Sequence, residues 1–302
     1  MAFAALGSNS TQTDPARRRK SKVVVILLLP GLAYLALFFL TPLISLVMTS
    51  LQAPVEFGDV GQYQTAFRIE NYAIVIEAYW PHFIRAFGYA LAATFFALVI
   101  SYPLAYFIGV KARPWPLLQA LMLTLVIAPF FISFLLRTLA WKQLMSDDSA
   151  IVSSLKALTI LPADGHLTGT AFSVIFGLTY NFLPFMTLPI YASLERLDPR
   201  LVEAGSDLYA GGFTTFRKVT FPLSMPGVVS GTLLTFIPAS GDFVNSVLLG
   251  NNTTTMIGQV IDSRFFKVSD YPTAAALSVA LMVVILGLVM AYVRRSGTEE
   301  LL

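Results

Sequence analysis

The sequence has no cysteine and few charged residues, and each shortage excludes a class of protein. The lack of cysteine excludes disulfides, thiolate metal sites and cysteine nucleophiles. Charged residues make up 12% of the chain, whereas soluble domains carry about 25%. Hydrophobic residues make up 56%, and the mean hydropathy is +0.72. These values indicate a membrane protein and argue against a soluble enzyme built around one buried core.

Catalytic and nucleotide-binding motifs are also missing. The sequence contains no GxxxxGK[ST] phosphate loop and no GxSxG or HExxH motif. Its two histidines, His82 and His166, show no metal-ligand spacing. We therefore expect no catalytic residue, no metal site and no cofactor in this chain.

Six hydrophobic runs are long enough to cross about 30 Å of hydrocarbon. They are residues 23–49, 84–109, 117–141, 171–194, 223–248 and 272–293. The first run follows the basic segment RRRKSK. We interpret it as an uncleaved span, because it is too long for a signal peptide and shows no small-residue cleavage site. The sequence predicts an all-α membrane protein with a disordered tail (1–22), a transmembrane domain (23–294) and a second tail (295–302).

Lysine and arginine are distributed unevenly between the segments that connect these runs. One alternate set holds 13 of the 20 basic residues, and it comprises the N-terminal tail, 110–116, 195–222 and 294–302. The opposite set holds four, and it comprises 50–83, 146–170 and 249–271. The positive-inside rule then predicts that both termini and residues 195–222 are cytoplasmic. This distribution explains the net charge of +3 without a nucleic-acid partner.

A hydrophilic island, residues 195–226, separates two of the hydrophobic runs. Asp198 and Pro199 are typical of a helix N-cap and a first helical residue. The apolar residues that follow share one helical face, and they are Leu197, Leu201, Ala204 and Leu208. Gly211 and Gly212 can end the helix. The pattern predicts an amphipathic helix over 199–210, which can lie in the lipid interface or dock in a groove of a soluble partner.

This island resembles the cytoplasmic EAA loop of permease subunits from bacterial ABC importers. The family pattern is Glu-Ala-Ala, a glycine four residues later, and a later proline. Glu203 and Ala204 match it, Gly205 replaces the second alanine, and Tyr209 stands at the glycine position. The resemblance implies a type I ABC importer permease fold with a cytoplasmic coupling helix. The implied contacts with the ATPase are Leu201, Glu203, Ala204, Gly205, Asp207 and Leu208.

Longer stretches resemble the first permease subunit of spermidine/putrescine ABC importers. They are ENYAIVI (70–76), SYPLAYFIG (101–109), APFFISFLLRTLAW (128–141), LPFMTLPIYASLERLD (183–198) and TFPLSMPGVVSGTLLTFIPASGDF (220–243). The resemblance implies a bacterial inner-membrane subunit that pairs with a second permease. It also implies two ATPase subunits that bind ATP and Mg, and an extracytoplasmic substrate-binding protein. The alternatives are a permease for thiamine, iron or sulfate and an ion-coupled secondary transporter.

Asp242 is an acidic residue inside an otherwise apolar run, where a charge costs a few kcal/mol. Pro238 and Gly241 precede it, so we expect the helix to break there and its backbone to face a cavity. Aromatic faces attract ammonium groups. We therefore expect a pathway for a small cation that includes Asp242, Phe243, Tyr180, Phe185 and Tyr191. The alternative is that Asp242 pairs with Arg137 for structural reasons alone.

Gly227 and Gly231 form a small-xxx-small pair in the fifth run, which predicts close packing against another helix. Tyr79 and Trp80 suit either an aromatic belt at the lipid interface or a docking site for an external partner.

Overall fold

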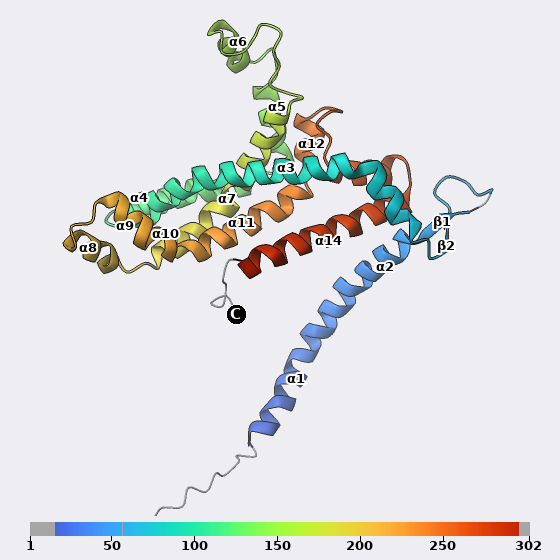
Figure 1. Cartoon of the computed structure of the whole chain (residues 1–302), viewed down its shortest axis with the longest axis horizontal. Coiled ribbons are helices and arrows are strands. Elements are labelled where there is room, and N and C mark those ends of the chain that lie inside the picture. The colour runs from blue at the N-terminus through green and yellow to red at the C-terminus, as the bar shows by residue number, and fades with distance from the viewer. Residues whose placement is uncertain (1–15, 56, 296–302) are drawn as a thin grey trace, which may run out of the picture. The chain divides into compact units, whose positions relative to one another are not determined.

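The computed structural model describes residues 16–55 and 57–295 (Figure 1), and the chain divides into two compact units between Met48 and Thr49. Helix α1 (Ala16–Leu35), a π-helical turn (Ala36–Leu40) and helix α2 (Thr41–Ser50) follow one another. From Val24 to Ser50 they form one apolar helix that is long enough to cross a membrane. Most of its large apolar side chains are exposed, as expected for groups that meet lipid or another subunit.

The second unit is built around four helices that pack along one another (Figure 1). They are α3 (Glu70–Tyr106), α7 (Ala171–Glu195), α11 (Met225–Ser240) and α14 (Tyr271–Arg295). Helix α3 contacts the other three, and α7 also contacts α11. Four helices of the described residues are long and apolar enough to be membrane spans, and the count rises to six if each of two bent pairs is one span.

Close contact between α7 and α11 depends on two glycines. A Cβ atom on Gly227 would lie 2.5 Å from the carbonyl oxygen of Pro189, and one on Gly231 would lie 2.9 Å from that of Met186. Real Cβ atoms do not approach oxygen so closely, so the predicted close packing at these glycines is confirmed.

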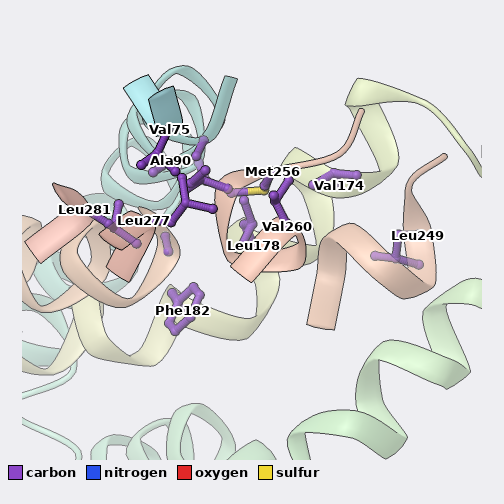
Figure 2. Close-up of a cluster of buried hydrophobic side chains, with 14 of the residues drawn as sticks. Val75, Ala90, Val174, Leu178, Phe182, Leu249, Met256, Val260, Leu277 and Leu281 are labelled. Carbon is purple, nitrogen blue, oxygen red and sulfur yellow. The ribbon is translucent and has the colours of Figure 1, made fainter. Parts of the chain in front are cut away.

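The main hydrophobic core lies where α3, α7 and α14 meet the segment 249–260 (Figure 2). Val75 and Ala90 come from α3, and Leu178 and Phe182 come from α7. Figure 2 shows Met256 and Val260 between these side chains and Val174, with Leu277 and Leu281 of α14 beside them. A second cluster includes Tyr102, Met186, Ile190 and Leu194, closer to the loop that holds residues 195–222.

The predicted span 117–141 is not one straight helix. Helix α4 (Pro116–Ile127) and a 3₁₀ turn (Ala128–Phe131) are bent by 95° from helix α5 (Phe134–Leu144). Ile132 and Ser133 have ψ angles of 137° and 134°, which no helix can include. Hydropathy alone shows no such break, although Pro129, three residues before Ile132, is a residue that disrupts helices.

The predicted span 223–248 is also divided. Three short segments, α9 (Gly212–Thr215), a π-helical turn (Phe216–Thr220) and α10 (Phe221–Leu223), meet α11 at a bend of 62°. Helix α11 ends at Ser240, and α12 (Val244–Leu249) begins after an interruption at residues 241–243. The predicted break beside Gly241 and Asp242 is therefore confirmed.

The remaining elements are short. They are the antiparallel strands β1 (Gln52–Pro54) and β2 (Tyr63–Thr65), a π-helical turn (Phe107–Lys111), α6 (Ala150–Ala157), α8 (Pro199–Asp207), α13 (Ile257–Asp262) and a further π-helical turn (Ser263–Lys267). Of the tail predicted as disordered, residues 1–15 lie outside the described residues. Residues 16–22 form the start of α1, since Ala, Arg and Lys are good helix formers. Residues 296–302 also lie outside the described range.

Candidate functional site

Helix α8 is shorter than the predicted 199–210, because it ends at Asp207, before Gly211 and Gly212, and each of its ends has a local cause. Asp198 Oδ1 accepts a 3.0 Å hydrogen bond from the backbone N–H of Arg200, so Asp198 is the N-cap that the sequence predicts. At the other end, Tyr209 has a φ angle of +55°, in the left-handed region. The N–H of Ala210 donates to the carbonyl of Gly205 at 3.0 Å, which is the bond of a Schellman C-cap. Tyr209 thus adopts the backbone conformation that the family's glycine suits best.

The apolar face of α8 points away from its own chain. Leu201 is 46% exposed and Leu208 is 80% exposed, and Ala204 is exposed beside them. Tyr209 and Phe213 extend this exposed apolar surface beyond the helix. The acidic side chains of Glu203 and Asp207 are exposed as well. An exposed apolar surface rimmed by acids marks an interaction site rather than a solvated loop.

Helix α8 packs on its own chain through Gly205, which lies one turn after Leu201 at the edge of the exposed apolar face. A Cβ atom on Gly205 would lie 2.8 Å from the side chain of Thr215, which is buried. Gly205 therefore allows α8 to lie close to α9, and it supports the candidate surface without lying on it. This explains why a glycine at the third position of the EAA-like sequence is compatible with the fold.

Arg113, which sequence reasoning did not select, ties the segment 110–116 to the same loop. Its Nη2 donates to the carbonyl oxygens of Leu194 and Leu197 at 3.3 and 3.1 Å, and it also contacts that of Glu195. Leu194 and Glu195 are the last residues of α7, where carbonyl groups lack the usual helical partners, and Leu197 follows the helix. A cavity of about 320 Å³ lies next to this contact and is lined by Val110, Arg113, Pro114, Leu194, Leu197, Asp198, Pro199, Val202 and Glu203.

A second contact fixes the bend between α10 and α11. Tyr102 Oη of α3 lies 2.7 Å from Ser224 Oγ, and both residues are buried. The Tyr102 ring packs against Phe216 and Phe221, with centroids 5.6 and 5.7 Å away. Ser224 stands at the 62° bend itself. Nothing in the hydrophobic pattern distinguishes Tyr102 from other tyrosines, so this contact could not be found from the sequence.

At the interruption after α11, Asp242 acts as a helix cap. It is 8% exposed, and its Oδ1 accepts a 2.8 Å hydrogen bond from the backbone N–H of Asn245 in α12. Within the part of the chain that the structure describes, no ion pair shorter than 4.0 Å joins Asp242 to Arg137. The structure therefore gives Asp242 a capping role and does not show the alternative pairing with Arg137.

Buried amides continue from Asp242 toward α5. Asn181 Nδ2 of α7 donates to Asn245 Oδ1 at 3.1 Å and to Thr138 Oγ1 at 3.0 Å. The residue after Asn245, Ser246, donates a hydrogen bond from its Oγ to Gln259 Oε1 at 2.7 Å. We call the residues Arg137, Thr138, Asn181, Asp242, Asn245 and Ser246 the polar layer. The polar residues at 181 and 245 in apolar runs were the signal that sequence reasoning passed over.

The aromatic residues expected to share a pathway with Asp242 lie at separate levels of α7. Tyr180 packs edge-on against Trp141, Phe185 packs against Phe130, and Tyr191 donates a hydrogen bond to Glu195 Oε1 at 2.6 Å. The distance along the helix axis from Tyr180 to Tyr191 is about 16 Å. Phe243 follows Asp242 directly and is 44% exposed. Phe243 is the neighbour of Asp242 in the sequence, whereas the three aromatic residues of α7 contact other partners.

A family model described as "Binding-protein-dependent transport system inner membrane component" matches residues 101–296. The spermidine/putrescine transport system permease protein PotB of Salmonella typhimurium is 34% identical over 281 residues, covering 92% of this chain and 94% of the relative. PotB of Escherichia coli is 34% identical over 87% of this chain and 94% of its own length. The inner membrane ABC transporter permease protein YdcU of Escherichia coli is 30% identical over 78% of this chain and 75% of its length.

Two solved structures share the fold. A chain of a bacterial ABC transporter involved in the import of the acidic polysaccharide alginate has a TM-score of 0.66 at 17% identity, and the match covers 93% of this chain and 97% of that one. A chain of the MetNI methionine ABC transporter has a TM-score of 0.56 at 19% identity, with coverage of 72% and 93%. The chain belongs to the family of binding-protein-dependent transport system inner membrane components, and it is a PotB-like permease of the ABC importer type.

Proposed function

We propose that this chain forms half of the transmembrane pathway of an ATP-driven importer for polyamines such as spermidine and putrescine. The family identifies a multi-pass importer permease, and the polyamine is taken from the printed names of the PotB relatives. The observation that best supports this proposal is the exposed face of α8. Leu201, Leu208 and Tyr209 form an exposed apolar surface, and such surfaces mark sites where another protein binds.

The partners in this proposal are a second permease, two ATPase subunits and an extracytoplasmic substrate-binding protein. ATP and Mg bind to the ATPase subunits, and hydrolysis takes place there rather than in this chain. Helix α8 docks in a groove of one ATPase as an amphipathic helix does. Both termini and residues 195–222 lie in the cytoplasm, as the distribution of basic residues favours.

In this account, movement of the ATPase reaches the spans through packed contacts. Helix α8 rests on Thr215 through Gly205, Arg113 binds the end of α7, and Tyr102 binds Ser224 at the start of α11. A displaced α8 therefore carries α7, α9 and α11 with it. The substrate path passes Asp242 and Phe243, where a carboxylate and an aromatic face suit an ammonium group.

The test replaces Glu203 with lysine in the complete importer. We expect Glu203→Lys to leave the chain in the membrane and to weaken its co-purification with the ATPase or the stimulation of ATP hydrolysis by substrate. The matched control is Asp148→Lys, a charge reversal at an exposed acid on the predicted external side. Equal loss in both variants, or normal assembly and stimulation in Glu203→Lys, would contradict a coupling role for α8.

A further inference from the structure

Arg137 is a buried cation without a visible counter-charge. It lies in the first turns of α5 and is 8% exposed, and its Nε and Nη1 atoms have no hydrogen-bond partner among the described residues. Its Cζ lies 5.7 Å from the centroid of the Phe134 ring. Of the carboxylates in the described part of the chain, none lies within 4.0 Å of it. An unpaired charge in an apolar interior is costly, so an arrangement that gives Arg137 a counter-charge is favoured.

A chain of hydrogen bonds leads from the residue after Arg137 to the acid Asp242. Thr138, the next residue, accepts from Asn181, which also donates to Asn245. Asn245 in turn donates its backbone N–H to Asp242. Helices α5 and α12 contact each other, so this network joins Thr138, the neighbour of Arg137 in α5, to Asp242 just before α12.

This network is incomplete in the present conformation. Asn181 Oδ1 and Asn245 Nδ2 are buried and, like the Arg137 nitrogens, have no partner in the described part of the chain. Buried polar groups are almost always hydrogen-bonded, and half-satisfied networks are poorly stable. The polar layer therefore favours a second arrangement, in which a change at the interruption 241–243 moves Asp242 away from its cap.

We propose that Arg137 competes with the cationic substrate for Asp242, and that it drives release of the substrate from this level of the membrane. The inference rests on the proposed function, because it needs a substrate that carries ammonium groups. An ammonium group of the polyamine pairs with Asp242 as it passes. The guanidinium of Arg137 then replaces it, and the carboxylate keeps a counter-charge when the substrate leaves.

Competition solves a general difficulty of carboxylate sites in membranes. A buried carboxylate that binds an ammonium group well also releases it slowly, whereas transport needs binding that can be reversed. The guanidinium of Arg137 lowers the free-energy cost of substrate release, because the carboxylate of Asp242 is never left without a counter-charge. Arginine suits this role, since it stays protonated and can bind a carboxylate through two N–H groups.

The first test measures spermidine uptake against concentration in proteoliposomes that hold the complete importer. We expect Arg137→Gln to lower both KM and maximal uptake by roughly fivefold or more, because the substrate stays longer on Asp242. Arg137→Lys, which keeps the charge, should retain most of the uptake. The double variant Arg137→Gln/Asp242→Asn should lose the fall in KM. A fall in maximal uptake with unchanged KM, or the same KM shift in the double variant, would overturn the proposal.

The second test does not depend on the substrate. It compares the melting temperatures of Arg137→Gln, Asp242→Asn and the double variant in two states, without nucleotide and trapped with a nucleotide analogue. Non-additive shifts in one state alone support pairing of the two charges in that state. Additive shifts in both states would overturn it. Non-additive shifts in an importer that takes up no polyamine would keep the pair of charges and reject the polyamine as substrate, so the two failures are distinguishable.

Discussion

At the scale of single residues, Tyr209 occupies the position where the family's motif has glycine. Its φ of +55° is uncommon for a residue with a large side chain, and such a conformation costs about 1–2 kcal/mol. The Schellman bond from Ala210 to Gly205 holds it there. The departure from the motif therefore leaves the end of α8 intact and places an exposed aromatic ring next to the surface proposed for docking.

We expect Tyr209→Gly to raise the free energy of unfolding by about 1 kcal/mol relative to Tyr209→Ala, because glycine adopts this conformation freely and alanine does not. Thermal melting of the purified subunit in detergent measures the difference. Equal melting temperatures for the two variants would show that the left-handed backbone at residue 209 carries no strain.

Asp147 is a residue outside the spans for which a pH effect can be predicted. A 2.6 Å hydrogen bond with His166 lowers the pKa of the Asp147 carboxyl below its usual value, and Lys156 at 3.5 Å acts in the same direction. The stabilising contact is therefore complete above the ordinary pKa of an aspartate and is lost as the pH falls through the lowered value.

Replacing His166 with alanine should accordingly raise the pKa of Asp147. Carbon-13 NMR of labelled aspartate carboxyl groups follows the titration directly. The control variant is Asp164→Asn, a change at an exposed acid of the same loop, which should leave the titration of Asp147 unchanged. An unchanged titration of Asp147 in His166→Ala would contradict the contact.

At the scale of elements, the close packing of helices α7 and α11 requires two residues that have no side chain beyond a hydrogen atom. The glycines at 227 and 231 leave room for the carbonyls of Pro189 and Met186. This contact belongs to the route by which α8 is proposed to move the spans, so its geometry matters for coupling as well as for stability.

Gly227→Ala should therefore destabilise the subunit by about 1–3 kcal/mol, the usual cost of overpacking. The matched control is Gly287→Ala in α14, where a new Cβ meets nothing within 4 Å. Melting temperatures of the two variants should differ, with Gly287→Ala at or above the wild type because alanine favours helix. Similar values for both would mean that α7 and α11 separate easily.

The sequence could predict elements that depend on local pattern. The cap at Asp198, the glycine contact of α11 and the break beside Gly241 all follow from residue type and spacing. It could not predict the 95° bend at Ile132, because extended residues in an apolar run leave no mark on hydropathy. It also missed Arg113, Tyr102 and Asn181, whose roles depend on partners far away in the chain.

At the scale of the whole molecule, the orientation in the membrane determines which surface meets the ATPase. We expect a cysteine at Leu208 to be protected from an impermeant thiol reagent in intact cells and a cysteine at Ala163 to react. The chain has no cysteine of its own, so the labelling has no background from this chain. Reaction at position 208 together with protection at 163 would reverse the topology.

The central claim is that this permease carries a polyamine under the control of ATP. The most direct measurement is uptake of labelled spermidine into proteoliposomes that contain this chain, its second permease and the ATPase, with the binding protein added outside and ATP enclosed. The account predicts uptake that requires ATP and the binding protein and that unlabelled putrescine inhibits. Unaltered spermidine uptake without ATP, or ATP-dependent uptake of thiamine or sulfate but not of spermidine, would contradict it.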